Sequence, residues 1–215
     1  IERTFTASPT RKFFGTLYNT YSFFTLYANI DGFDYSEADM EIEKRPEIDR
    51  WVLSKLNTLV QSVDEAFETY EPTKAGRLIQ EFVNDQLSNW YVRLCRRRFW
   101  KSEDSQDKIS AYQTLYTCLE TVAIISSPIA PFFMDQLFSD LNKVTNRFDT
   151  TSVHLVDFPK VNEAIINKEL EAQMDIAQRV SSLVLGLRKK ERLRVRQPLQ
   201  KIMVPALSAE FAKNI

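Results

Sequence analysis

Apolar residues recur at steps of three and four along most of this sequence, which is the period of amphipathic α-helices. The clearest stripe starts at residue 48 and comprises Ile48, Val52, Leu56, Leu59, Val63, Phe67 and Tyr70. Upstream, the segment 10–29 has helical spacing in its large side chains, namely Phe13, Phe14, Leu17, Tyr18, Tyr21 and Phe24. The pattern therefore predicts a helix in each of the two segments.

Three further stripes follow a break at Glu71-Pro72. The first of them contains Ile79, Val83, Leu87, Trp90 and Leu94. The second contains Ile109, Tyr112, Tyr116, Leu119 and Ala123, and the third, beyond a proline-containing break over 127–131, contains Phe132, Phe133, Leu137, Phe138 and Leu141. Short breaks between long amphipathic helices make neighbours antiparallel, so the pattern predicts an all-α, up-and-down bundle.

The same pattern divides the chain into three predicted parts. Residues 1–45 combine the first helix with an acidic linker, and residues 46–160 form the helical bundle, which is irregular from 143 onward. Residues 161–215 begin with a long helix over 161–194. The apolar run Leu199 to Val204 predicts a strand, and because a lone strand has no partner here, we interpret it as the start of a truncated domain.

Composition supports helices and limits the chemistry. Four glycines in 215 residues are too few for a turn-rich β protein, and 44% hydrophobic residues suffice for a substantial core. Cys95 and Cys118 are too few and too far apart for a disulfide scaffold or a zinc site, so we expect two buried, reduced cysteines. No run of about 18 apolar residues is present to span a membrane, and no signal-peptide pattern opens the chain. We expect a cytoplasmic, monomeric fragment of a longer protein.

Catalysis is poorly supported by the residues. The sole histidine, His154, lies in an irregular apolar stretch without a candidate nucleophile, so a structural histidine is the better interpretation. No two glycines fall within ten residues of each other, which excludes a glycine-rich phosphate loop. The sequence therefore predicts no catalytic residue, no metal site and no cofactor in this chain.

A basic and aromatic cluster over 88–101 is the strongest functional signal. Its cationic residues, interleaved with Trp90, Tyr91, Phe99 and Trp100, are Arg93, Arg96, Arg97, Arg98 and Lys101. Arginine pairs bidentately with phosphate, and flat aromatic rings stack on unpaired bases. The alternative is a solvated helix end, where basic residues complement the helix dipole. A net charge of −1, from 28 basic and 29 acidic residues, argues against a wholesale polyanion binder but leaves a local patch open.

The helical period separates the members of this cluster. At about 100° per residue, Arg93 and Arg97 fall on the same stripe as Ile79 and Trp90. For Arg93, nearer the core, we expect a buried or interfacial ion pair. We expect Trp100 to be an exposed stacking residue beside a projecting basic tip made of Arg96, Arg97, Arg98 and Lys101.

A second basic cluster lies at the end of the helix predicted over 161–194. Six of the nine residues 188–196 are basic, and the candidates for a backbone phosphate contact are Arg188, Lys189, Arg192, Arg194 and Arg196. Charge runs are usually solvated faces, so this cluster is weak evidence by itself. Two basic patches in a chain of net charge −1 require acids elsewhere, as in 31–49, and hence a polarised surface.

Several segments, in order, resemble one family. Leu87 to Arg93 together with Arg96 to Trp100 resembles a characteristic helix of isoleucyl-tRNA synthetases. Asp49 to Asn57 resembles the opening of that family's anticodon-binding domain, and 111–116 and 127–132 resemble its third and fourth helices. Residues 152–155 and 195–199 are similar to the segments that follow, and 11–23 is similar to the helix after the catalytic domain. The matches cover about residues 10–204.

The resemblance implies an anticodon-binding helical bundle of the class I synthetase type, with flanking helices. Its implied partners are isoleucine tRNA and the catalytic domain of the same chain. The HIGH and KMSKS motifs are absent, so ATP with magnesium is implied for the parent enzyme only, and this piece is implied to be inactive alone. Structural or interdomain roles are expected for Asn89, Trp90, Tyr91 and Arg93. The rival hypothesis is a helical interdomain or protein-interaction module without direct RNA contact.

Overall fold

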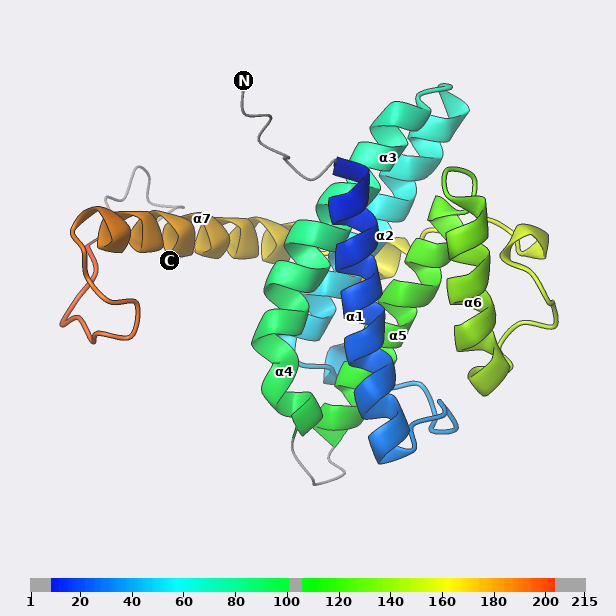
Figure 1. The fold of residues 1–215 in the computed structure, drawn as a ribbon, viewed down its shortest axis with the longest axis horizontal. Coiled ribbons are helices and arrows are strands. Elements are labelled where there is room, and N and C mark those ends of the chain that lie inside the picture. Colours follow the sequence, from blue (N-terminus) through cyan, green and yellow to red (C-terminus); the bar gives the residue numbers. More distant parts are fainter. Residues whose placement is uncertain (1–8, 101–105, 204–215) are drawn as a thin grey trace, which may run out of the picture. The chain divides into compact units, whose positions relative to one another are not determined.

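The computed structural model describes residues 9–100 and 106–203, except for the side chains of residues 9–11. Every regular element within these ranges is helical (Figure 1), which confirms the predicted all-α class for the described residues. The chain divides into two compact units, the first ending at Ile166 and the second beginning at Asn167. No helix in the described part is both long and apolar enough to cross a membrane.

The predicted strand over Leu199 to Val204 is wrong for the residues that the structure describes. Residues 199–203 are irregular, and no strand occurs within 9–100 or 106–203. The apolar side chains of Leu199, Ile202 and Met203 are exposed. An apolar run without a neighbouring strand has no hydrogen-bond ladder to join, so its composition alone does not make it a strand. Val204 lies outside the described residues.

Helix α1 (Pro9–Asp31) opens the first unit and ends at Gly32. Gly32 has a φ of 68°, and the amide of Phe33 donates to the carbonyl of Ala28 at 2.9 Å, an arrangement typical of glycine-ended helices. Phe24 of α1 is buried, with its ring centroid 6.1 Å from that of Tyr112. Helix α1 therefore packs against the helices of the predicted bundle, within the first compact unit.

Helix α2 (Glu47–Glu68) follows Pro46, as the sequence predicts. Glu47 and Asp49 lie in its first turn, where negative charge complements the helix dipole. Its predicted stripe faces the core, with Val52, Leu56, Leu59 and Val63 buried. Tyr70 has a φ of 57° in the break that reverses the chain, and it is exposed instead of extending the stripe.

One continuous helical rod runs from Pro72 to Trp100. It consists of α3 (Pro72–Glu81), a π-helical segment (Phe82–Val92) and α4 (Arg93–Trp100). Pro72 occupies the first turn of α3, where its missing N–H costs nothing. The rod buries a row of side chains at Ile79, Val83, Leu87, Tyr91, Cys95 and Phe99.

Helix α5 (Gln106–Ser126) lies in the middle of the first unit and is buried on nearly all sides. The apolar side chains of Leu115, Leu119 and Ile125 are fully buried. The helix also buries polar residues that have hydrogen-bond partners, namely Ser110, Gln113 and Thr114. Helix α6 (Pro131–Thr145) packs against α5 and ends at Asn146, which has a left-handed φ of 49°. The stretch that follows is irregular, as predicted, apart from short 3-10 turns at Val153–Leu155 and Glu163–Ile165.

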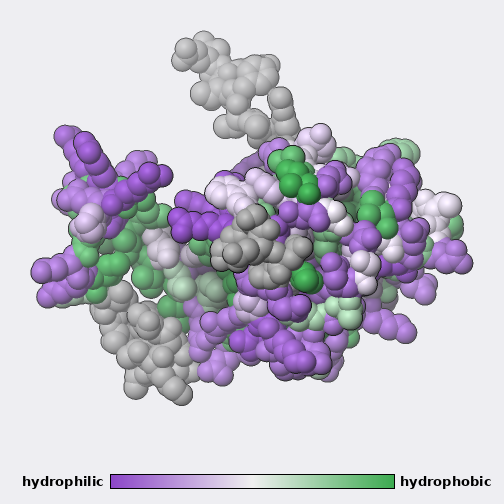
Figure 2. All heavy atoms as spheres, turned by 90° about the horizontal axis from the view of Figure 1, so that it is seen from below, coloured by the Kyte–Doolittle hydropathy of each residue, from purple (hydrophilic) through white to green (hydrophobic). Residues whose placement is uncertain are grey.

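The second unit contains α7 (Lys168–Lys190). The helix starts later than the predicted residue 161 because the Asn167 side chain accepts a hydrogen bond from the amide of Leu170, which caps the first turn. Leu183, Leu185 and Leu187 are exposed on α7. In Figure 2 this unit accordingly shows hydrophobic surface among hydrophilic tips, whereas the face of the first unit seen there is largely hydrophilic.

Candidate nucleic-acid interface

The outer side of α4 carries three arginines and a tryptophan on one stripe. Arg93, Arg96, Arg97 and Trp100 are spaced i, i+3, i+4 and i+7, which places them on the same side of an α-helix. All four are exposed, Trp100 to 56%. We name these four residues the basic face. Lys101, which the sequence analysis grouped with them, lies outside the described residues.

The environments of Arg93 and Arg98 are the reverse of those that the sequence predicts. Arg93, expected in a buried or interfacial ion pair, is exposed and has no ion pair among the described residues. Arg98, expected at a projecting tip, is turned inward with a side chain that is 13% exposed, and it pairs with Asp49. The expectation for Arg93 rested on a regular α-helical period through residues 79–97, and that period is what the structure corrects.

The π-helical segment accounts for this reversal. Six of the buried residues from Ile79 to Phe99 form one row at strict steps of four, and Phe82, Asn84 and Val92 are buried beside that row. In an α-helix each such step overshoots a full turn by about 40°, so five steps drift by about 200° and put the ends on opposite sides. The i→i+5 hydrogen bonds of a π-helix take more residues per turn and absorb this drift. Strict fourfold spacing over six apolar residues is therefore the sequence signal that locates the segment.

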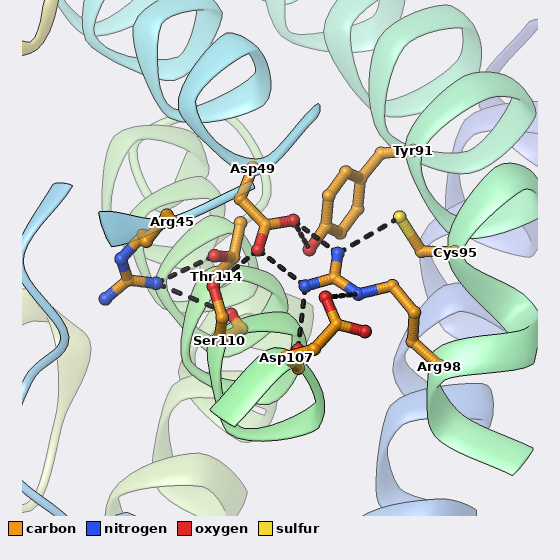
Figure 3. A network of polar contacts seen from close by, with 8 residues as sticks. All are labelled: Arg45, Asp49, Tyr91, Cys95, Arg98, Asp107, Ser110 and Thr114. Carbon is orange, nitrogen blue, oxygen red and sulfur yellow. Dashed lines mark hydrogen bonds and ion pairs between the residues drawn. The ribbon is translucent and has the colours of Figure 1, made fainter. Parts of the chain in front are cut away.

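A single buried carboxylate joins four elements near the end of α4 (Figure 3). Asp49 of α2 has no exposed surface, and it accepts from the hydroxyls of Tyr91 at 2.9 Å and Ser110 at 2.5 Å. Arg98 donates from Nη1 to Oδ1 at 2.6 Å and from Nη2 to Oδ2 at 2.8 Å. Asp49 therefore connects α2 with the π-helical segment, α4 and α5.

Arg98 also reaches the first turn of α5. Its Nη2 donates to the carbonyl of Asp107 at 2.7 Å, and its Nε lies 3.0 Å from the Asp107 carboxylate. Burial lowers the pKa of Arg98, but the hydrogen bonds and charge of Asp49 outweigh that effect, so the pKa is raised and the guanidinium stays charged. A buried ion pair of this kind is stable because further hydrogen bonds satisfy both partners.

The surroundings of this network raise the pKa values of the Tyr91 phenol and the Cys95 thiol. Burial raises the pKa of Tyr91, and the charge of Asp49 raises it further, so the phenol remains a donor at neutral pH. Burial also raises the pKa of Cys95 to about 11, against the opposing effect of Arg98, whose Nη1 lies 3.5 Å from the sulfur. Cys95 and Cys118 are both buried and free, as predicted.

A second buried arginine attaches the acidic linker to α5. Arg45 donates from Nη1 to the hydroxyl of Thr114 at 2.8 Å and from Nη2 to Oε1 of Gln113 at 3.1 Å. Its Nε donates to the carbonyl of Met40 at 3.1 Å. No local sequence pattern distinguishes a polar residue that is bonded inside the protein from a solvated one, so the network formed by Arg45, Asp49, Asp107 and Ser110 is not predictable from the sequence.

The other expected structural residues differ in their surroundings. Tyr91 is fully buried and bonded to Asp49, which agrees with a structural position. Trp90 is half-buried and Asn89 is exposed. His154, expected to be a structural histidine, is exposed, and only its backbone amide is bonded, to the Ser152 hydroxyl at 3.3 Å. The 3-10 turn carries its side chain outward, so it does not pack in the core.

The second basic cluster is divided between a structural arginine and solvated ones. Arg188, in the last turn of α7, donates from Nη1 to the carbonyls of Arg194, Val195 and Gln197 at 2.8, 3.2 and 2.9 Å. It therefore folds the following segment back on the helix end, where a cation also complements the dipole. The remaining predicted members are exposed, namely Lys189, Arg192, Arg194 and Arg196.

The first unit has an apolar end as well. Figure 1 shows the starts of α1 and α3 and the α5–α6 turn at one end, and the close of α4 with the start of α5 at the other. A groove of about 270 Å³ at the first end is lined by Phe13, Phe14, Gly76, Arg77 and Ile129, among others. Phe132 beyond the turn is 90% exposed. The described residues contain no group of three or more histidine, cysteine or acidic side chains that could hold a metal ion.

Comparison with known proteins supplies a family. The family described as the anticodon-binding domain of tRNA ligase matches residues 49–203. The chain is 66% identical over 197 residues to an isoleucine–tRNA ligase of Bacteroides fragilis and 64% identical over 205 residues to that of Bacteroides thetaiotaomicron. It is 42% identical over 199 residues to the isoleucine–tRNA ligase of Thermus thermophilus.

These similarities concern one segment of longer proteins. They cover 92%, 95% and 93% of this chain, but only 17%, 18% and 19% of the three relatives. The chain thus spans about a fifth of the length of the relatives that it matches. The matched family region includes α4, with the basic face, and the buried Asp49 that begins it.

Proposed function

The chain belongs to the family of anticodon-binding domains of tRNA ligases, and we propose that its basic face binds the anticodon side of isoleucine tRNA. The observation that carries this proposal is the exposure of Arg93, Arg96 and Arg97 on one stripe of α4, beside an exposed Trp100. Three guanidinium groups that have no ion pair within residues 9–100 and 106–203 lie within two helical turns, and together they attract a polyanion. At physiological salt this attraction extends about 8 Å, so a local patch suffices despite the net charge of −1.

The arginines supply affinity and orientation. Guanidinium groups pair with phosphate oxygens bidentately, and each phosphate that is neutralised releases counterions from the RNA. Such contacts position an RNA on the protein without reading its sequence. Trp100, at the same end of the stripe, offers a flat ring on which an unpaired base of the anticodon loop stacks.

The exposed residues of the second unit fit an additional backbone contact. Lys189, Arg192, Arg194 and Arg196 are free to meet phosphates, whereas Arg188 is already bonded to three carbonyls. We therefore assign the RNA contact in this cluster to the four exposed residues only. Arg98 is removed from the proposed contact set of α4 for the same reason, since its donors are used by Asp49 and Asp107.

The proposal assigns the catalytic functions of the ligase to parts of the full-length protein outside this chain. ATP- and magnesium-dependent joining of isoleucine to tRNA takes place in parts of the full-length ligase outside these 215 residues. The apolar end, with Phe13, Phe14, Ile129 and the 90% exposed Phe132, fits a contact with the catalytic domain of the same polypeptide. The rival hypothesis made the whole chain a protein-interaction module; the proposal restricts protein interaction to this apolar end.

Filter binding of the full-length ligase to isoleucine tRNA and to a non-cognate tRNA, across a salt series, tests the RNA role. We expect cognate preference and a steep linear fall of log affinity with log salt concentration. Arg96→Ala combined with Arg97→Ala should weaken binding by about tenfold and lower the slope by about 1 to 2. The control is Lys160→Ala, an exposed cation in the irregular stretch after α6, outside both basic clusters and the apolar end. Equal losses in both variants would contradict the assignment to the basic face.

A further inference from the structure

Arg98 occupies a position on α4 that determines where the basic face points. Relative to Arg98, the side chains of Arg97 and Arg96 are rotated about the helix axis by about 100° and 200°, and that of Arg93 by about 140°. When Arg98 faces the core, the other three must face away from it. The direction of the basic face is therefore linked to a single inward-facing guanidinium.

The rotation of α4 is not fixed by a regular helix alone. The π-helical segment directly upstream changes which side of α4 faces the core. In an uninterrupted α-helix Arg93 would lie on the buried side, whereas here Arg93 is exposed and Arg98 points inward. An additional constraint downstream of Val92 is needed to select one phase. Cys95 and Phe99 contribute apolar burial, and the Asp49 carboxylate contributes a directional contact.

A bidentate arginine–carboxylate pair fixes rotation as well as distance. Two parallel N–H···O bonds between planar groups are satisfied in one relative orientation, unlike the contact of a single ammonium group. Asp49 is itself held, because it accepts from Tyr91 and Ser110 and has no exposed surface. Arg98 is held a second time by Asp107 of α5. The network in Figure 3 thus connects a rigid carboxylate in α2 to the orientation of α4.

We propose that Asp49 and Arg98 are positioning residues for tRNA binding, which turn Arg93, Arg96 and Arg97 toward the RNA without contacting it themselves. This inference rests on the proposed function and specifies how that site is arranged. It makes the buried ion pair part of the RNA-binding apparatus, although neither residue meets the ligand. It also separates Arg98 from the neighbouring arginines, which composition alone would treat as equivalent.

The first test uses Asp49→Asn in the full-length ligase, with circular dichroism to measure the folded fraction. The asparagine side chain has nearly the shape of aspartate, but it carries no charge and so weakens the bidentate pair, leaving Asp107 as the charged partner of Arg98. A positioning role predicts a rise in the Kd for isoleucine tRNA of about fivefold and a lower salt slope, because fewer arginines are aligned with phosphates. If Arg98 instead bound RNA directly, its release would leave the Kd unchanged or lower it, which would overturn the proposal.

The second test, Arg98→Lys, keeps the net charge and is informative even if Asp49→Asn does not fold. Lysine cannot form the bidentate pair, so we expect a similar rise in the Kd and a lower salt slope without loss of a cation. The same substitution in an Arg96→Ala and Arg97→Ala background should have a smaller further effect, since Arg93 is the only one of the three positioned arginines that remains. A merely structural role would lower affinity equally in both backgrounds, and that result would overturn the proposal.

The outcomes distinguish this inference from the proposed function. If Arg96→Ala with Arg97→Ala weakens binding while Asp49→Asn and Arg98→Lys bind as the wild type does, the basic face stands and the positioning role is refuted. If the arginine variant itself binds normally with an unchanged salt slope, the proposed function fails and the inference fails with it. Weaker binding in all three variants, with the expected non-additivity, supports both.

Discussion

The guanidinium of Arg98 donates to both carboxylate oxygens of Asp49, at 2.6 and 2.8 Å, across 49 positions of sequence. Its neighbours Arg96 and Arg97 are exposed. Of the three consecutive arginines 96–98, one therefore forms a buried ion pair and two face solvent. The division follows from the helical phase of α4, and that phase depends on the π-helical segment before it.

Removing the buried carboxylate should destabilise the first unit strongly. Asp49→Ala leaves the largely buried Arg98 without its main partner and also removes the acceptor of Tyr91 and Ser110. Breaking a buried pair from one side costs about 3–5 kcal/mol. We expect a loss of this size in the free energy of unfolding, measured by urea denaturation. Asp64→Ala, at an exposed position of the same helix, should change it by less than about 0.5 kcal/mol.

Deletion of Asn89 should be tolerated, although it removes a residue from the middle of a packed helix. Asn89 is exposed within the π-helical segment, and one residue less allows i→i+4 bonding there. The buried positions from Ile79 to Phe99 then follow an ordinary α-helical stripe, so Arg98 should still reach Asp49. Thermal unfolding should show a small decrease in the midpoint, of about 5 °C or less, corresponding to about 1 kcal/mol.

The matched control is deletion of Gln61, which is exposed in the regular helix α2. There the loss of one residue rotates everything downstream by about 100° and moves Val63 and Ala66 out of the core. We expect this variant to be unfolded or insoluble at 37 °C. Similar damage from both deletions would contradict the view that the π-helical segment contains one residue more than an α-helix needs.

The sequence predicts the helices of the first unit well because their signals are local. Stripes at steps of three and four, together with Pro46, Pro72 and Pro131, locate α2, α3 and α6 closely. The exposure of Arg96, Arg97 and Trp100, three of the four members of the basic face, is also predicted correctly. What the sequence does not reveal is tertiary, since the partners of Arg98 lie on α2 and α5 and no spacing rule connects them.

Stability should decrease at alkaline pH because the buried thiol of Cys95 and the half-buried phenol of Tyr21 hold their protons more tightly in the folded state. Burial raises the pKa of Cys95 from 9.0 to about 11, and it raises that of Tyr21 from 10.0 to about 12. The unfolded chain therefore binds fewer protons than the folded chain above pH 9, and the free energy of unfolding falls as pH rises. The stabilisation is complete below pH 9 and is lost progressively up to about pH 12.

Urea denaturation at half-unit intervals from pH 8 to pH 12 measures this decrease. Tyr21→Phe removes one of the titrating groups, so its stability should fall less steeply than that of the wild type between pH 10 and pH 12. Identical slopes for the two proteins would mean that the phenol of Tyr21 titrates alike in the folded and unfolded states.

Arg188 should protect the segment that follows α7 from proteolysis. Its three hydrogen bonds to the carbonyls of Arg194, Val195 and Gln197 hold this segment against the helix end. Arg188→Gln should increase tryptic cleavage after Arg192, Arg194 and Arg196 by about tenfold, if each carbonyl bond contributes about 0.5 kcal/mol to keeping the segment closed. Lys189→Gln, which removes the adjacent exposed cation, should leave the cleavage rate unchanged.

Crosslinking from α4 to tRNA tests the central claim most directly. A photoreactive reagent is attached to a cysteine introduced by Leu94→Cys, at a 52% exposed position beside the basic face. Cys95 and Cys118 are buried and can stay, whereas reactive cysteines in the rest of the full-length ligase are replaced first. The account predicts that the full-length ligase labelled there crosslinks to the anticodon stem and loop of isoleucine tRNA, whereas a probe introduced by Gln61→Cys on α2 does not. Crosslinks confined to other parts of the tRNA, or equal yields from both probes, would contradict it.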